Sequence, residues 1–261
     1  MKKIVFFAFL LLGIHYSQSQ LVDEYEINVG YSIFQGDYGV RGDFTSTMGN
    51  SGFLVGGKAY FNLLDYYRGG CYPCQHVKFP LSFTIGYSLL NFDHADINTS
   101  SPEALKVKAF RGKIFQSSLS FGFEYHIGDL KKYAFDVDNF WQNFDPYVGL
   151  SAGAAVYAVS LKSDLGDFKL NPNVLPQAFQ GHVYDKPNIV PVITMEAGLR
   201  YNLSSNMNLT INGKWLYYIS DRVDGLSPDP SLVDNVHDDW QFAPSIGIVI
   251  MPGGGGFFAQ R

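Results

Sequence analysis

The stretch Ile189–Ser220 holds two runs in which apolar and polar side chains alternate, joined by the short connection Ser204–Asn206. A period of two predicts β-strands, and both runs exceed the usual length of about five to six residues. One face is apolar and aromatic, whereas the other carries Glu196, Arg200 and Lys214. Such a hairpin fits a soluble sandwich with its apolar face inside, or a membrane barrel with that face against lipid.

The first residues favour export of the chain. Lys2 and Lys3 precede the apolar run Ile4–Ile14 and the small-residue site Ser17–Ser19, which is the order of a secretory signal peptide cleaved after Ser19. No apolar run reaches the about 18 residues of a membrane-spanning helix. We therefore divide the chain into a signal peptide (1–19), a barrel (20–251) and a Gly-rich C-terminal tail (252–261).

Composition narrows the class further. Aromatic residues make up 16% of the chain and charged residues also 16%, with a net charge of −5 and 27 Gly. A typical soluble protein has about 25% charged residues. An acidic exported chain without a basic block argues against nucleic acid as a partner. The combination favours an outer-membrane barrel, whose partner is the lipid bilayer.

Six further alternating runs accompany the hairpin. In chain order the eight predicted strands are Tyr25–Phe34, Gly52–Leu63, Phe79–Leu90, Gly112–Tyr125, Tyr147–Val159, Ile189–Leu203, Met207–Ser220 and Asp239–Met251. No helical periodicity separates them, and Asn91–Arg111 is expected to be a polar loop. Long loops follow the odd-numbered strands. We expect an all-β, eight-stranded antiparallel up-and-down transmembrane β-barrel in the outer membrane, with both termini in the periplasm.

The inward face of these strands predicts a charged lumen. Its ionisable residues are Glu26, Lys58, Glu124, Glu196, Arg200 and Lys214. Eight strands enclose an interior that side chains just fill, and buried charges are tolerated when they are paired. Three carboxylates facing three cations therefore predict an ion-pair network that plugs the barrel. A proton or ion pathway is the alternative, while a diffusion pore needs more strands.

Acidic residues gather in the predicted outer loops. Because the first and last strands adjoin in a closed barrel, the first and fourth outer loops should lie together, and their acids are Asp37, Asp43, Asp221, Asp224, Asp234, Asp238 and Asp239. These carboxylates could bind Ca²⁺, although the spacing matches no EF-hand. The alternative is a salt-bridged, Asp-capped loop cluster, which Arg41 and Arg222 favour. We expect no other cofactor.

Two further groups carry little chemistry. Cys71 and Cys74 in an exported chain predict a local disulfide. The same pair could instead form a metal site with His76, which would lack a fourth ligand. It could also be a redox motif, but such a motif needs a helix N-terminus to lower the pKa of the thiol. His94, His126, His182 and His237 are scattered, and no nucleophile, base and orienting residue can be grouped from the sequence. We therefore expect that the protein is not an enzyme.

Four segments resemble a known family: Glu26–Phe44, the GLRYNL of strand six, SDRVDGLSP (220–228) and DNVHDDW (234–240). The chain resembles the small, mostly uncharacterised outer-membrane β-barrels of Bacteroidota, and more remotely PorG, the barrel subunit of type IX secretion. The resemblance implies a structural or accessory subunit that works with other envelope proteins in type IX secretion or outer-membrane assembly. The alternatives are a small-solute or ion channel and a lipid-A-modifying enzyme. One departure is the last strand, which ends in Met251 and Pro252 instead of a terminal aromatic residue.

Overall fold

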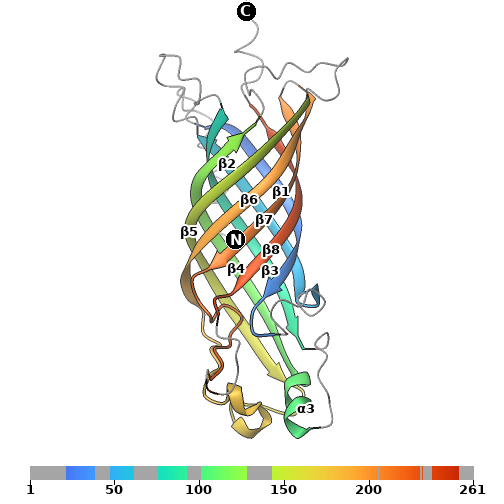
Figure 1. The fold of residues 1–261 in the computed structure, drawn as a ribbon, viewed down its shortest axis with the longest axis vertical. Helices are drawn as coiled ribbons and strands as arrows, with labels where there is room; N and C mark the ends of the chain where they lie inside the picture. Colours follow the sequence, from blue (N-terminus) through green and yellow to red (C-terminus); the bar gives the residue numbers. More distant parts are fainter. Residues whose placement is uncertain are drawn as a thin grey trace, which may run out of the picture.

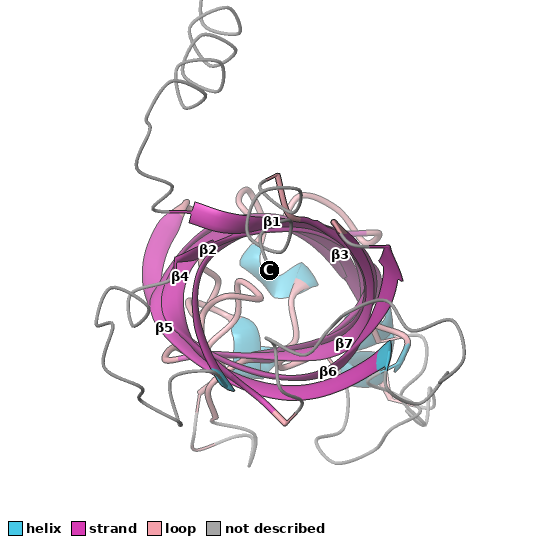
Figure 2. Ribbon diagram, turned by 90° about the horizontal axis from the view of Figure 1, so that it is seen from above, coloured by secondary structure: helices cyan, strands magenta, loops and turns pink. Residues whose placement is uncertain are grey.

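Eight β-strands form a closed antiparallel barrel in which each strand pairs with its neighbours in the chain (Figure 1). The computed structural model describes residues 22–38, 48–61, 76–92, 101–127, 143–204, 206–229, 231 and 237–252. The strands are β1 (Val22–Gln35), β2 (Ser51–Phe61), β3 (Val77–Asn91), β4 (Phe110–His126), β5 (Phe144–Ser163), β6 (Asn188–Ser204), β7 (Met207–Tyr218) and β8 (Trp240–Ile250). β1 pairs with β8, which closes the ring seen along the axis in Figure 2. The predicted fold class is confirmed.

Five observed strands extend beyond the predicted ones, most of all β5, which begins at Phe144 instead of Tyr147 and ends at Ser163 instead of Val159. β2, β7 and β8 instead end one or two residues earlier than predicted. The expectation of a purely polar loop before β4 is wrong, because helix α3 (Pro102–Lys108) lies there. Ser101 caps this helix by accepting a hydrogen bond from the Ala104 amide, which satisfies a free N–H of the first turn. The signal peptide and the turns after β2 and β4 lie largely outside the described residues.

α3 marks one end of the barrel, which we call the loop end (Figure 1). The β5–β6 connection, with 3₁₀ helices η4 (Pro172–Val174) and η5 (Gln177–Phe179), folds at this end. It pairs with the β7–β8 connection through the bridge between Val183 and Leu226 and the bond from the Tyr184 amide to the Gly225 carbonyl, 2.8 Å long. These connections form a cap over the loop end.

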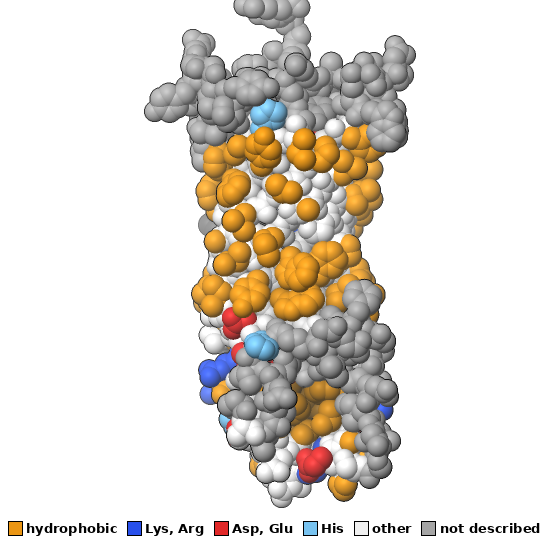
Figure 3. Space-filling view, viewed as in Figure 1, with side chains coloured by type: hydrophobic (Ala, Val, Ile, Leu, Met, Phe, Trp, Pro, Cys, Tyr) orange, Lys and Arg blue, Asp and Glu red, His pale blue; other side chains and the backbone are white. Residues whose placement is uncertain are grey.

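The outer wall of the barrel is apolar (Figure 3). Its exposed side chains include Ile27, Val29, Phe53, Val55, Phe83, Phe115, Leu119, Phe121, Leu150, Met195, Ile211, Trp215 and Ile246. Among the described residues, no helix is long and apolar enough to cross a membrane. A closed ring of strands with apolar residues outside and polar residues inside is the arrangement of outer-membrane barrels, because lipid covers the wall and every strand edge is paired. The chain is an integral outer-membrane β-barrel protein.

Aromatic rings lie on the wall towards both ends of the barrel. Trp215 and Trp240 pack with ring centroids 4.8 Å apart on β7 and β8, and Phe144 and Tyr201 pack at 4.8 Å on β5 and β6. The strand pairing places Trp215 and Trp240 towards the loop end, and Phe144 and Tyr201 towards the opposite end. Aromatic residues at these levels suit the two membrane interfaces.

The interior changes in character along the barrel axis. From the loop end, the inward residues of β4 are Phe110 and Ile114, then Gln116, Ser118 and Ser120, then Glu124 and His126. The inward residues of β1, β3 and β6 follow a similar order. In β7, by contrast, Lys214 precedes Asn212 and Thr210, and β8 begins with Gln241 and ends with buried Val249. The barrel therefore contains an apolar plug, an amide and hydroxyl layer, and a charged layer, all formed by buried side chains.

Candidate functional site

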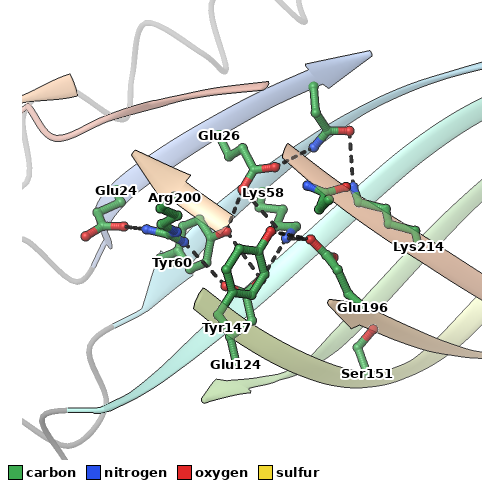
Figure 4. A network of polar contacts seen from close by, with 12 residues as sticks. Glu24, Glu26, Lys58, Tyr60, Glu124, Tyr147, Ser151, Glu196, Arg200 and Lys214 are labelled. Carbon is green, nitrogen blue, oxygen red and sulfur yellow. Dashed lines mark hydrogen bonds and ion pairs between the residues drawn. The ribbon is translucent and has the colours of Figure 1, made fainter. Parts of the chain in front are cut away.

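The charged layer is centred on Lys58 of β2, whose side chain is 1% exposed (Figure 4). Its Nζ lies 2.7 Å from Oε1 of Glu124, 2.6 Å from Oε1 of Glu196 and 3.6 Å from Oε2 of Glu26. These carboxylates come from β4, β6 and β1, so one ammonium group connects four strands around the lumen. The strand stagger of a narrow barrel brings together groups that are distant in sequence.

Arg200 of β6 forms a second centre beside the first. Its guanidinium lies 2.7 Å from Glu24 and 3.3 Å from Glu124, and it stacks 4.6 Å from the centre of the Tyr60 ring. The hydroxyl of Tyr60 donates to Glu26 at 2.6 Å, and that of Tyr147 donates to Glu196 at 2.7 Å. Glu26, Glu124 and Glu196 are thus each held by both a cation and a tyrosine hydroxyl, which offsets the cost of burying their charges.

Lys214, the last of the six predicted lumen residues, makes no direct ion pair with a described carboxylate. Its Nζ donates to Oδ1 of Asn28 at 3.1 Å, and the Asn28 amide donates to Glu26 at 2.8 Å. The structure therefore brings all six predicted residues into one region of the lumen, five through ion pairs and Lys214 through an amide.

Sequence reasoning missed four ionisable residues of this layer. Lys78 pairs with Glu24, and His126 lies between two carboxylates, 2.5 Å from Asp145 and 3.4 Å from Glu124. All four residues lie one or two positions beyond the end of a predicted strand, and the alternation of that strand would point their side chains inward: Glu24, Lys78, His126 and Asp145. Extending each strand by two residues would have found them. Together with the six predicted residues, these four give the layer five carboxylates, four Lys or Arg cations and one histidine.

Next to the charged layer lies a layer of uncharged polar side chains. Tyr218 donates to both Gln116 and Gln241, at 2.7 and 2.8 Å. Gln116 donates to Gln241, which donates to Ser32, and Ser32 lies 3.0 Å from Ser88. This chain of hydrogen bonds crosses the lumen between β1, β3, β4, β7 and β8.

The loop end is closed by an apolar plug, which we did not expect in a polar lumen. Its residues come from strands and cap alike: Phe34, Leu54, Leu90, Phe110, Ile114, Tyr157, Val190, Val192 and Leu216, with Tyr38, Phe92, Leu175, Phe179, Val223 and Leu226. Tyr38 stacks on Phe92 at 4.9 Å and on Phe110 at 6.0 Å. Here the strands enclose a core like that of a soluble domain, because the cap covers it.

The predicted acidic cluster is partly assembled beside this plug. The Asp37 amide donates to Asp224 at 2.6 Å, and the Val223 and Asp224 amides donate to Asp239 at 2.8 and 3.1 Å. Burial raises the pKa of Asp224 to about 7. Burial and the charges of Asp224 and Asp37 hold the pKa of Asp239 well above its usual value. Three acids crowded in this way favour protonation or a bound cation.

The remaining predicted residues lie elsewhere. Asp238 accepts from the Tyr217 hydroxyl at 2.8 Å, and Arg222 stacks on Tyr184 instead of entering the acidic cluster. Asp43, Asp234, Cys71 and Cys74 are outside the described residues. In the part of the chain that the structure describes, no group of three or more His, Cys, Asp or Glu side chains has the geometry of a metal site. The hydrogen bonds from backbone amides to Asp224 and Asp239 are those expected of a loop cluster capped by Asp side chains.

No protein-family model and no curated protein matches the chain. Solved structures similar to it include Neisserial surface protein A (13% identity, 87% of this chain and 96% of that chain, TM-score 0.45). A major outer membrane protein from Thermus thermophilus is 12% identical over 87% of this chain and 98% of that one, with a TM-score of 0.42. The attachment invasion locus protein Ail of Yersinia pestis, solved with the heparin analogue sucrose octasulfate, is 14% identical over 88% and 99%, with a TM-score of 0.37.

Proposed function

We propose that this outer-membrane barrel is a non-enzymatic structural or accessory subunit of an envelope complex that serves type IX secretion or outer-membrane assembly. The observation that carries the proposal is the filled lumen. Along the axis, side chains from opposite walls meet in the charged layer, then in the amide layer, then in the apolar plug. A barrel filled in this way offers its surfaces to partners instead of its interior to a solute.

The cap supplies a surface for such a partner. Leu105 of α3 is 52% exposed, and Leu165 and Leu170 of the β5–β6 connection are 52% and 85% exposed. Exposed leucines on an extramembrane cap are costly in water and are typical of protein contact surfaces. The choice of complexes rests on the resemblance of the Asp-rich segment between the last two strands to the barrel subunit of type IX secretion.

Affinity purification of the full-length protein from native membranes tests the proposal. We expect at least one stoichiometric envelope partner, and we expect the double substitution Leu165→Ser, Leu170→Ser to reduce its recovery at unchanged barrel content. Lys169→Ser, in the same connection, is the matched control. Recovery of the barrel alone after mild crosslinking would contradict the subunit proposal.

The enzyme alternative has a separate test. Lipid A should have the same mass spectrum in cells with and without the gene, because no nucleophile, base and orienting residue were assembled from the sequence. A mass difference that matches loss or gain of an acyl chain would overturn the non-enzymatic part of the proposal.

A further inference from the structure

The inner wall formed by β6 and β7 carries a column of buried polar atoms that hydrogen-bond to nothing in the described chain. In order from the β6–β7 turn, the atoms are Oδ1 of Asn202 and Asn208, Nε of Arg200, Oγ1 of Thr210 and Nδ2 of Asn212. The residues are neighbours across the two strands, because Asn202 pairs with Asn208 and Arg200 pairs with Thr210. Asn212 is the next inward residue of β7. We call these five atoms the polar column.

Towards the loop end, the column continues to Lys214 and its direct strand partner Glu196, which both have unused hydrogen-bonding capacity (Figure 4). An ammonium group has three N–H donors, and Nζ of Lys214 makes one hydrogen bond, to Asn28 at 3.1 Å. Oε1 of Glu196 accepts both hydrogen bonds of this carboxylate, whereas Oε2 accepts none from a described residue. The Glu196 side chain is 8% exposed, the most of the three carboxylates around Lys58. A space that admits a water molecule therefore adjoins this carboxylate in the lumen.

The apolar plug ends this polar path. Leu216, the next inward residue of β7 after Lys214, belongs to the plug and is buried. Its partner on β6 is Thr194, and the inward residue after Thr194 is Val192, which is also buried in the plug. The polar path along this wall therefore begins beside the β6–β7 turn and stops at the level of Lys214.

The chemistry of the path identifies the ligand that suits it. Its hydrogen-bond acceptors are the two asparagine oxygens and Oε2 of Glu196. Its donors lie on Arg200, Asn212 and Lys214. Arg200 and Lys214 would repel a cation, and an anion would leave the acceptors unpaired beside Glu196. Water both donates and accepts, so it can pair every one of these groups, which are costly to bury unpaired.

We propose that the inner wall of β6 and β7 binds a row of water molecules that hydrates Lys214 and Glu196 from the side of the β6–β7 turn. A buried water makes about three hydrogen bonds, so the column and these two side chains would hold roughly three waters. Polar groups lie about 5 Å apart across the strands and about 7 Å apart along them, which hydrogen-bonded waters bridge. Protons exchange along such a row, whereas the plug stops ions. This inference does not depend on the proposed subunit function.

High-resolution crystal structures of the full-length protein, grown in chloride and in bromide, test the identity of the ligand. We expect water density within hydrogen-bond distance of Oγ1 of Thr210, Nδ2 of Asn212 and Nζ of Lys214, and no anomalous bromide signal there. A bromide peak at the column would make it an anion site and overturn the proposal. A direct ion pair between Lys214 and Glu196 that closes the space would overturn it as well.

A substitution tests the hydration of the column in a lipid bilayer. Thr210→Val replaces the hydroxyl by a methyl group of similar size. In a hydrated column this change removes a hydrogen bond to water and should lower the urea midpoint of the protein in lipid vesicles. In a dry column it removes an unpaired polar group and should raise the midpoint. Thr84→Val, which removes the hydroxyl 2.5 Å from Oγ of Ser118, is the matched control and should lower the midpoint in either case. A midpoint for Thr210→Val at or above that of the wild type would refute the water row.

Discussion

Nζ of Lys58 on β2 lies 2.6 Å from Oε1 of Glu196 on β6. In a ring of eight strands, β2 and β6 are four positions apart in both directions, so this ion pair joins opposite walls of the barrel. The side chains are 1% and 8% exposed. A single buried pair therefore spans the lumen at the level of the charged layer.

Removing this cation should destabilise the barrel. The substitution Lys58→Met keeps an unbranched side chain, one atom shorter, but leaves Glu26, Glu124 and Glu196 without their shared ammonium group. Loss of one partner of a buried ion pair typically costs about 3–5 kcal/mol. We expect a lower midpoint in urea titrations of the protein in lipid vesicles, read by heat-modified gel mobility. Lys169→Met on the cap is the control, and equal midpoints for both variants would contradict the importance of the network.

Gly198 of β6 should tolerate no side chain. It is the direct partner of Tyr147, and a Cβ at this position would lie 2.5 Å from the Tyr147 ring. Gly198→Ala should push this ring away from Glu196 and cost about 1–3 kcal/mol, as overpacking does. Gly57→Ala is the matched control, because its Cβ would meet only the Glu26 carbonyl, at 3.4 Å. Unfolding midpoints of the two variants test the difference; if they are the same, Tyr147 does not depend on Gly198.

The stability of the cap should fall as the pH rises from about 4 to 7. The pKa of Asp224 is raised from 3.8 to about 7, so the folded protein holds a proton that the unfolded chain has released in this window. The free energy of unfolding therefore decreases as the pH rises, by roughly 2–4 kcal/mol, and levels off above the folded pKa. Limited proteolysis of the cap between pH 4 and 8 measures the change.

Asp239→Asn separates this effect from general acid sensitivity. Its side-chain oxygen can still accept from the Val223 and Asp224 amides, while the second carboxylate oxygen, which has no partner within the described residues, becomes an N–H donor. We expect a cap that resists proteolysis better at pH 8 and depends less on pH. Asp238→Asn, one residue earlier in the chain, should keep the pH dependence of the wild type. The opposite ranking of the two variants would refute the role of the acidic cluster.

The wild-type barrel should not conduct ions. The charged layer, the amide layer and the apolar plug each fill the lumen, so planar bilayers that contain the protein should show current at or below the background of protein-free bilayers. Reproducible unitary steps that disappear with inactivated protein would support the channel alternative instead.

The sequence predicted the wall of the barrel better than its contents. Alternation in Ile189–Ser220 and six other runs indicated which side chains face out, because consecutive side chains of any strand point to opposite faces. It also placed Glu26, Lys58 and Glu196 on the inward side. It missed Asp145 and His126, since the predicted strands ended before the observed ones.

The sequence by itself determined the class of the protein: period-two strands, an apolar outer face and a set of inward charges that must pair. Only the tertiary structure decided which charges meet. The direct strand partner of Lys58 is Glu26, yet Nζ lies 3.6 Å from Glu26 and 2.6 Å from Glu196 on the far wall. Strand stagger and lumen diameter set that choice, and the folding of the cap over Phe110 and Tyr38 made the apolar plug. The alternation of residues along one strand carries no information on the stagger of the strands, the diameter of the lumen or the folding of the cap.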